Sequence, residues 1–159
     1  MMRTFTAVGC VLAAACVHVP PREPTPPRQV IVDAPLERVW DMTIAVLEER
    51  NLPLSMRDRN ARLLEGERDS LPRTQGTVAD CGRALGVTLS PTAARYSFRL
   101  HGDSLRTVIT MTVTWVFGRL ESAKALVCAS NGVWEAELAT LIKKRAEADK
   151  ESLMDPGEM

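Results

Sequence analysis

The chain has few of the residues that mark catalytic, metal or nucleic-acid sites. Its 159 residues include two histidines, one tyrosine, three phenylalanines and three tryptophans, and aromatic residues make up only 4%. So few aromatics argue against a platform on which bases stack. The 20 Lys and Arg residues balance the 20 Asp and Glu residues, so the basic excess of a dedicated nucleic-acid binder is missing. With no acidic cluster either, we expect no metal, no cofactor and no nucleic-acid partner.

No motif identifies a reaction, and we predict that the protein is not an enzyme and has no catalytic residue. His101 is expected on the polar face of a strand, just before an exposed turn that contains Asp103 and Ser104. An exposed turn is a poor setting for a general base, which needs an orienting carboxylate and a nucleophile. His18 lies in a proline-rich segment and is expected in solvent. Glycine-rich loops with the spacing needed to bind phosphate are absent.

Long hydrophobic runs are also missing, and the most apolar stretch lies at the N-terminus. In residues 1–15, eleven residues are apolar, Arg3 is the only charge, and the end is rich in alanine. This is the pattern of a secretory signal peptide. It is too short to span a membrane, which takes roughly 20 apolar residues. The structural alternative is a buried N-terminal helix.

The sequence Leu-Ala-Ala-Ala-Cys at 12–16 resembles the lipobox of bacterial lipoproteins. In that pattern the cysteine is acylated and becomes the first residue of the mature protein, so the resemblance implies lipid attachment at Cys16. Leucine usually stands three positions before the cysteine, where this chain has Ala13. Cys10 is a weaker match because it would leave too short an apolar region. The alternative is an ordinary signal peptide that is cut just before Cys16.

The segment 16–29 is predicted to be a tether. Five of the chain's ten prolines lie within it, namely Pro20, Pro21, Pro24, Pro26 and Pro27. Proline disfavours helix and sheet and favours the extended polyproline conformation. At about 3.1 Å per residue, the residues from Val17 to Gln29 would reach about 40 Å. We therefore expect a spacer that holds a folded domain away from a membrane surface, with the stable anchoring that several acyl chains provide.

Residues 30–148 are predicted to form one α+β domain, followed by a flexible tail at 149–159. The clearest signal is the strict alternation of apolar and polar residues over 95–101 and 105–117, which is typical of an antiparallel sheet with one buried face. Two amphipathic helices would cover one face of about five strands, in a helix-grip-like arrangement. The expected strands are 28–33, 52–56, 62–68, 95–101 and 105–117, and 87–89 and 125–128 are candidates for two further short strands. The expected helices are 35–50 and a second that begins after 130.

Short motifs in this domain resemble the helix-grip domains of BamC-type bacterial lipoproteins and of uncharacterised lipoproteins with one such domain. The resemblance covers roughly residues 28–146. It implies fold and compartment more than activity, because BamC-type proteins carry two such domains and this chain has room for one. It is carried by Val-Asp-Ala-Pro-Leu-Glu-Arg-Val-Trp at 32–40, Leu-Glu-Glu at 47–49, Arg-Asp-Arg at 57–59 and Cys-Ala-Ser-Asn-Gly at 128–132.

Two cysteines would remain in the mature domain, Cys81 and Cys128. In an oxidising periplasm two such cysteines usually pair, so we predict a structural disulfide. A free nucleophilic cysteine is the alternative, but neither a suitable histidine nor a Cys-x-x-Cys spacing accompanies either residue. The three tryptophans are expected on inner faces as core residues. Alternatively, Trp40 and Trp134 would line a groove between helix and sheet that holds an apolar ligand.

The leading functional hypothesis is a membrane-anchored lipoprotein that faces the periplasm and acts by binding an envelope protein, in assembly or maintenance of the envelope. Val17 follows the predicted lipid cysteine in place of aspartate, and by resemblance to lipoproteins this favours the outer membrane. The expected binding surfaces are the exposed face of the second helix and the side of the sheet that carries Arg95, Arg99 and His101. The alternative function is a carrier of a small apolar ligand. An enzyme is the third hypothesis, for which the sequence supplies no catalytic set.

Overall fold

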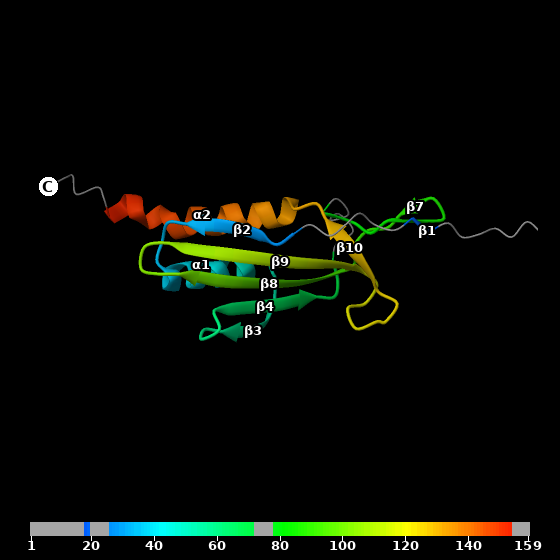
Figure 1. Ribbon diagram of the computed structural model, residues 1–159, viewed down its shortest axis with the longest axis horizontal. Helices are drawn as coiled ribbons and strands as arrows, with labels where there is room; N and C mark the ends of the chain where they lie inside the picture. Colours follow the sequence, from blue (N-terminus) through cyan, green and yellow to red (C-terminus); the bar gives the residue numbers. More distant parts are fainter. Residues whose placement is uncertain (1–17, 20–25, 72–77, 154–159) are drawn as a thin grey trace, which may run out of the picture.

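The computed structural model describes residues 18–19, 26–71 and 78–153, and it confirms the predicted α+β class (Figure 1). The predicted signal peptide, the predicted lipid-attachment residue Cys16 and the last residues of the predicted tail lie outside these ranges. The elements in chain order are β1 (His18–Val19), β2 (Arg28–Val32), α1 (Leu36–Glu49), β3 (Leu54–Asp58), β4 (Leu63–Arg68), β5 (Ala79–Asp80), β6 (Arg83–Ala84), β7 (Val87–Thr88), β8 (Ala93–Gly102), β9 (Thr107–Phe117), β10 (Leu126–Ser130) and α2 (Val133–Leu153).

The main sheet is antiparallel and is built around the long strand β9. Its strand order is β3-β4-β8-β9-β10-β5, and β2 pairs with β9 as well. One edge of β9 pairs with β8, whereas the other edge is shared, with β2 pairing as far as Met111 and β10 from Trp115 onward. The sheet therefore has seven strands where about five were expected. A small second sheet joins β1, β6 and β7.

Both helices lie on the same face of the main sheet. Their apolar stripes enclose the larger core with the inward side chains of the central strands, among them Tyr96, Phe98 and Leu100. The intervening residues Arg95 and Arg99 point to the opposite face and are exposed. None of the described elements covers that opposite face, which is turned toward the reader in Figure 1. The predicted two-layer arrangement is thus confirmed, with one buried face and one open face.

Cys81 and Cys128 form a disulfide, as predicted. The bond joins the residue after β5 to strand β10, and both cysteines are buried in a second, smaller apolar cluster with Trp115. Trp134 of α2 packs against both clusters, and its ring lies 5.4 Å from that of Trp115 between centroids. The disulfide therefore links the β5 segment covalently to β10, in the cluster against which the start of α2 packs.

Two stretches that were expected to be irregular form regular structure. Within the proline-rich segment, His18 and Val19 pair with Ala84 and Arg83 of β6. Neither residue is a proline, so each retains the backbone N–H that strand pairing requires. Helix α2 extends to Leu153, into the segment 149–159 that was predicted as a tail, and Ala146 near its end is buried in the core. The helix continues because position 146 falls on the inward stripe at four-residue spacing.

Candidate binding surface

The open face of the sheet carries the clearest candidate site, and the strand register assembles it. Six residues of β2, β9 and β8 form two neighbouring rows across it, and we call them the open-face patch. One row is Ile31–Val108–His101 and the other is Gln29–Thr110–Arg99. Ile31 is 51% exposed, which is high for a large apolar side chain in a sheet. The patch therefore combines an apolar surface with two basic side chains.

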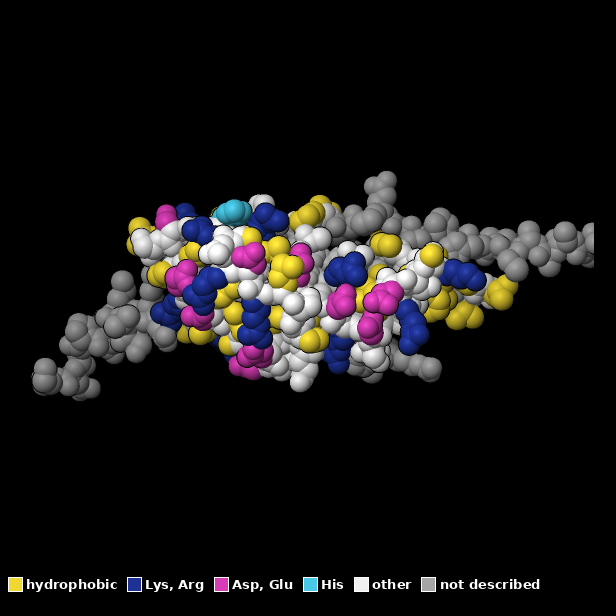
Figure 2. All heavy atoms as spheres, turned by 90° about the horizontal axis from the view of Figure 1, so that it is seen from below, with side chains coloured by type: hydrophobic (Ala, Val, Ile, Leu, Met, Phe, Trp, Pro, Cys, Tyr) yellow, Lys and Arg dark blue, Asp and Glu magenta, His cyan; other side chains and the backbone are white. Residues whose placement is uncertain are grey.

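The basic side chains of the open-face patch differ from most other arginines in the domain. The side chains of Arg99 and His101 make no ion pair or hydrogen bond with any other residue that the structure describes. By contrast, Arg95 on the same face pairs with Glu67 at 3.3 Å. Around α1, Arg59 pairs with both Glu37 and Asp41. In Figure 2 acidic and basic side chains alternate over the surface, and a histidine lies between basic side chains at one margin. Arg99 and His101 are thus available to an external partner.

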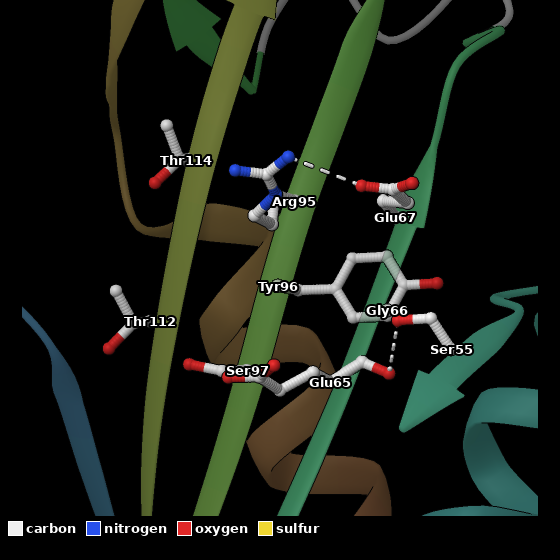
Figure 3. Close-up of a pocket in the computed structure, with 9 residues that line it drawn as sticks. All are labelled: Ser55, Glu65, Gly66, Glu67, Arg95, Tyr96, Ser97, Thr112 and Thr114. Atoms are coloured by element: carbon white, nitrogen blue, oxygen red, sulfur yellow. Dashed lines mark hydrogen bonds and ion pairs between the residues drawn. The ribbon is translucent and has the colours of Figure 1, made fainter. Parts of the chain in front are cut away.

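A shallow hollow of about 270 Å³ continues this face along β8 and β9. Gly66 and Tyr96 line part of it, although the side chain of Tyr96 belongs to the buried core on the other face of the sheet (Figure 3). Hydroxyl groups line much of it, and the Ser55 hydroxyl donates to the carbonyl oxygen of Glu65 at 3.3 Å. Hydroxyls can both donate and accept hydrogen bonds. The hollow therefore suits a polar partner. The hydroxyl residues that line it are Ser55, Ser97, Thr112 and Thr114.

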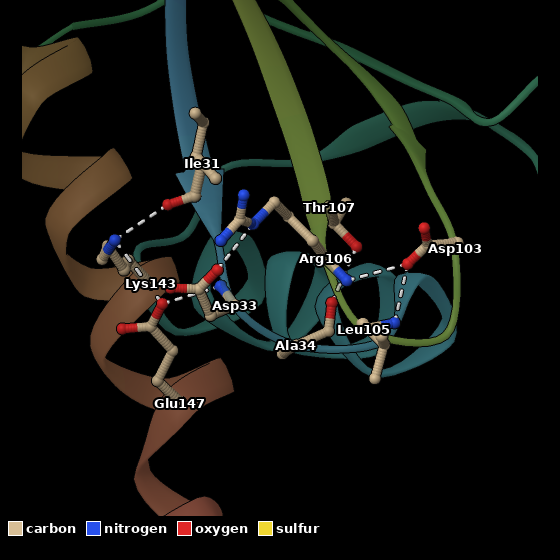
Figure 4. Close-up of polar contacts among 9 residues, drawn as sticks. All are labelled: Ile31, Asp33, Ala34, Asp103, Leu105, Arg106, Thr107, Lys143 and Glu147. Atoms are coloured by element: carbon tan, nitrogen blue, oxygen red, sulfur yellow. Dashed lines mark hydrogen bonds and ion pairs between the residues drawn. The ribbon is translucent and has the colours of Figure 1, made fainter.

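The turn between β8 and β9 fixes one end of the open-face patch (Figure 4). The Asp103 carboxylate accepts hydrogen bonds from the backbone N–H groups of Leu105 at 2.7 Å and Arg106 at 3.0 Å. These two bonds stabilise the charged form and lower the pKa of Asp103. The Arg106 side chain donates to Asp33 at 2.8 Å. The turn is thereby tied to the segment that follows β2.

Helix α2 holds the free edge of β2 from the other side. The Lys143 ammonium donates to the carbonyl oxygen of Ile31 at 2.9 Å, and the backbone N–H of Asp33 donates to the Glu147 carboxylate at 2.8 Å. Exposed strand edges tend to pair with other chains, and lysine is one of the residues that restrain them. These contacts orient the backbone of Ile31, so its side chain is presented on the open face (Figure 4).

The two tryptophans predicted to line a ligand groove do not share a cavity among those described. Trp40 is buried in the core, and the Arg59 guanidinium lies 5.6 Å from the centroid of its ring. Trp134 lines a hollow of about 110 Å³ with Arg50 and Arg68, among others. Small-molecule sites usually have about 300 Å³ or more. A larger groove of about 400 Å³ lies between β2 and α2, but it is lined by Val30, Ala139 and polar residues and by neither tryptophan.

Glu135 is a buried polar residue that the sequence alone does not single out. Glutamate is rarely buried unless it is paired, but Glu135 is only 5% exposed. The Ser130 hydroxyl donates to its carboxylate at 2.6 Å, and the Trp115 indole N–H donates to Ser130 at 3.3 Å. A carboxylate in the first turn also stabilises a helix N-terminus. Ser130 stands five residues before Glu135 and not three as in a capping box, so no standard helix-start motif indicated this network.

Comparisons with known proteins do not assign the chain to a family. No family model matches it, and no curated protein matches it in sequence. The resemblance to BamC-type lipoproteins therefore stays a prediction. In the described ranges, neither helix is long and apolar enough to cross a membrane. The same ranges hold no group of three or more His, Cys, Asp or Glu residues that is suited to a metal ion.

Proposed function

We propose that this protein is a lipid-anchored protein of the bacterial cell envelope that binds an envelope protein through the open face of its sheet. The anchor would be Cys16, at the end of the signal-like segment 1–15. The Cys81–Cys128 disulfide supports a compartment outside the cytosol, because structural disulfides persist in oxidising environments and are rare in reducing ones. With Val17 after the anchor, we propose that the protein faces the periplasm from the outer membrane.

The open-face patch is the observation that carries the binding proposal. An antiparallel sheet commonly leaves one face to solvent, and such a face is normally polar. The exposed apolar side chain of Ile31, in the same patch as Arg99 and His101, is therefore not explained by contact with solvent alone. Protein interfaces characteristically combine apolar side chains with arginine. The planar guanidinium of Arg99 suits a carboxylate, to which it can donate two parallel hydrogen bonds. The partner surface that fits best presents a carboxylate next to aliphatic side chains.

The other two functions have weaker support. A ligand carrier needs an enclosed apolar cavity, whereas the hollow beside Trp134 is small and Trp40 is packed in the core. An enzyme using His101 as a base needs an orienting group. His101 has no hydrogen bond to a carboxylate or hydroxyl within the described part of the chain. A binding function explains the arrangement of this face without either requirement.

A charge reversal on the patch tests the binding proposal. The lipidated protein would be isolated from native envelope membranes, and its co-purifying protein would be identified and its affinity measured. Arg99→Glu should weaken that affinity about tenfold or more, which corresponds to about 1.4 kcal/mol. Arg119→Glu is the matched control, because Arg119 is exposed in the loop between β9 and β10, away from the patch. Equal affinities for the two variants would refute the proposal.

The anchor has its own test. Intact mass of the membrane-extracted protein should show a chain that begins at Cys16 and carries acyl groups. Cys16→Ala should release the protein from membranes. A mature protein without added lipid mass would refute the anchor but leave binding through the patch open to the affinity test.

A further inference from the structure

The β6–β7 hairpin projects at one end of the molecule and carries exposed apolar side chains. Leu85 is 79% exposed and Val87 is 64% exposed. Leu85 and Gly86 form the two-residue turn, with φ values of 51° and 78°. Such turns favour asparagine or glycine, and a leucine with positive φ is uncommon. The backbone preference of this turn does not explain a leucine at position 85. Burial within the described domain does not explain it either.

The N-terminal segment pairs with this same hairpin. In strand β1, His18 lies opposite Ala84 and Val19 lies opposite Arg83. Cys16 is only two residues before His18, and two residues span at most about 7 Å. Acyl chains on Cys16 would therefore enter a bilayer close to the hairpin. Figure 1 shows β1 and β7 together at the end of the molecule opposite the turn that joins β8 and β9.

We propose that the tip of the β6–β7 hairpin inserts into the surface of the phospholipid bilayer that anchors Cys16. The inference rests on the proposed lipid anchor. Leu85 and Val87 would bury their side chains at the boundary of headgroups and acyl chains, which removes apolar surface from water. Arg83, at the base of the hairpin, would face anionic headgroups. In Figure 2 hydrophobic side chains and a basic one lie at this end of the molecule.

The insertion would orient the domain. The hairpin would rest on the membrane, so the domain would not be held at the end of an extended 40 Å spacer. The β8–β9 turn lies at the opposite end, and the open-face patch lies next to that turn through His101 and Val108. The patch would therefore lie at the end of the domain that is far from the lipid surface, where a partner in the periplasm can reach it.

Tryptophan substitution tests the insertion in the full lipidated protein. Leu85→Trp would be reconstituted into vesicles of phosphatidylethanolamine and phosphatidylglycerol, with and without brominated acyl chains. Compared with the wild type, we expect the additional tryptophan at position 85 to emit at a shorter wavelength. We expect the brominated acyl chains to quench its fluorescence. The control is Leu105→Trp, because Leu105 is 74% exposed but lies in the β8–β9 turn at the far end. Its added emission should be neither shifted nor quenched.

Val87→Trp gives a second reading in case the turn does not tolerate tryptophan at position 85. If intact mass shows acyl groups on Cys16 but neither hairpin tryptophan is quenched, the insertion is wrong and the anchor stands. Equal quenching of the Leu105→Trp protein would also refute a specific role for the hairpin. If no lipid mass is present on Cys16, both the anchor and the insertion proposed from it are refuted.

Discussion

The hydroxyl of Tyr96 donates a 2.6 Å hydrogen bond to the backbone carbonyl oxygen of Pro53. Gly66 lies against both residues, and a methyl group at position 66 would overlap both the Pro53 oxygen and the Tyr96 ring. The bond joins the central strand β8 to the residue just before the edge strand β3. It therefore fixes the edge hairpin β3–β4 against the core.

Tyr96 should titrate at unusually high pH. Burial raises its pKa from 10.0 to about 12, with the positive charge of Arg68 opposing the rise and the negative charge of Glu67 adding to it. It is the only tyrosine, so phenolate absorbance reports on it alone. The midpoint should be near pH 12 in the folded protein and near 10 in urea. A folded-state midpoint near 10 would contradict this environment.

The same shift predicts an alkaline loss of stability. Because the folded state holds the proton more tightly than the unfolded state, this contribution is complete below pH 10 and is lost as the pH rises toward 12. Tyr96→Phe should remove this part of the pH dependence. It should also cost about 1 kcal/mol near neutrality, because the hydrogen bond to Pro53 is lost. Urea unfolding of both proteins across pH 7–12 measures both effects.

Gly66→Ala should destabilise the domain by about 1–3 kcal/mol, because the added methyl group must displace strand β3 or the Tyr96 ring. Ser97→Ala in the neighbouring strand β8 is the control, since Ser97 is not confined in this way and the substitution should cost within about 0.5 kcal/mol. Urea denaturation of the two variants measures the difference. Equal midpoints would show that the crowding at position 66 relaxes without cost.

Removal of the Cys81–Cys128 disulfide should lower the free energy of unfolding by about 4 kcal/mol in the chain-entropy estimate, given its sequence separation of 47. Alanine at both positions is the suitable variant because both cysteines are buried. Reductant should destabilise the wild type but leave the double variant unchanged. A loss below 1 kcal/mol would mean that the bond adds little to the domain.

Ser130→Ala should cost about 1–3 kcal/mol, because it leaves the Trp115 indole N–H without its acceptor and the Glu135 carboxylate without its donor. Ser122→Ala is a suitable comparison, since that serine is exposed and its hydroxyl accepts only a local bond from the Lys124 N–H. Thermal unfolding followed by tryptophan fluorescence would rank the two. Similar losses would show that the buried network does not stabilise the start of α2.

The sequence predicted the parts of this account that depend on local periodicity. Alternation along β8 assigned Tyr96, Phe98 and Leu100 to one face and Arg95, Arg99 and His101 to the other, and the structure confirms it. Whether the second face was open could not be predicted in this way. That depends on both helices packing on one side, which the order of elements suggests but no local pattern fixes.

Long-range register explains what the sequence missed. The placement of Ile31 beside Val108 depends on pairing between residues 77 positions apart, and no periodicity encodes such a distance. Strands of two residues, such as β1 and β6, carry no measurable alternation. Glu135 has an ordinary helical context, and its burial follows from the distant Trp115 and the nearby Ser130. The sequence therefore predicted only part of the open-face patch, namely Arg99 and His101.

The most direct test of the central claim is photo-crosslinking from position 110, at the middle of the open-face patch. A photoreactive amino acid would replace Thr110 in the lipidated protein within native envelope membranes, and a second protein would carry it at Arg119 as the control. The account predicts a discrete adduct with one envelope protein from position 110, absent from position 119 and lost when Arg99→Glu is added. An adduct of equal yield with and without Arg99→Glu, or none from position 110, would contradict the account.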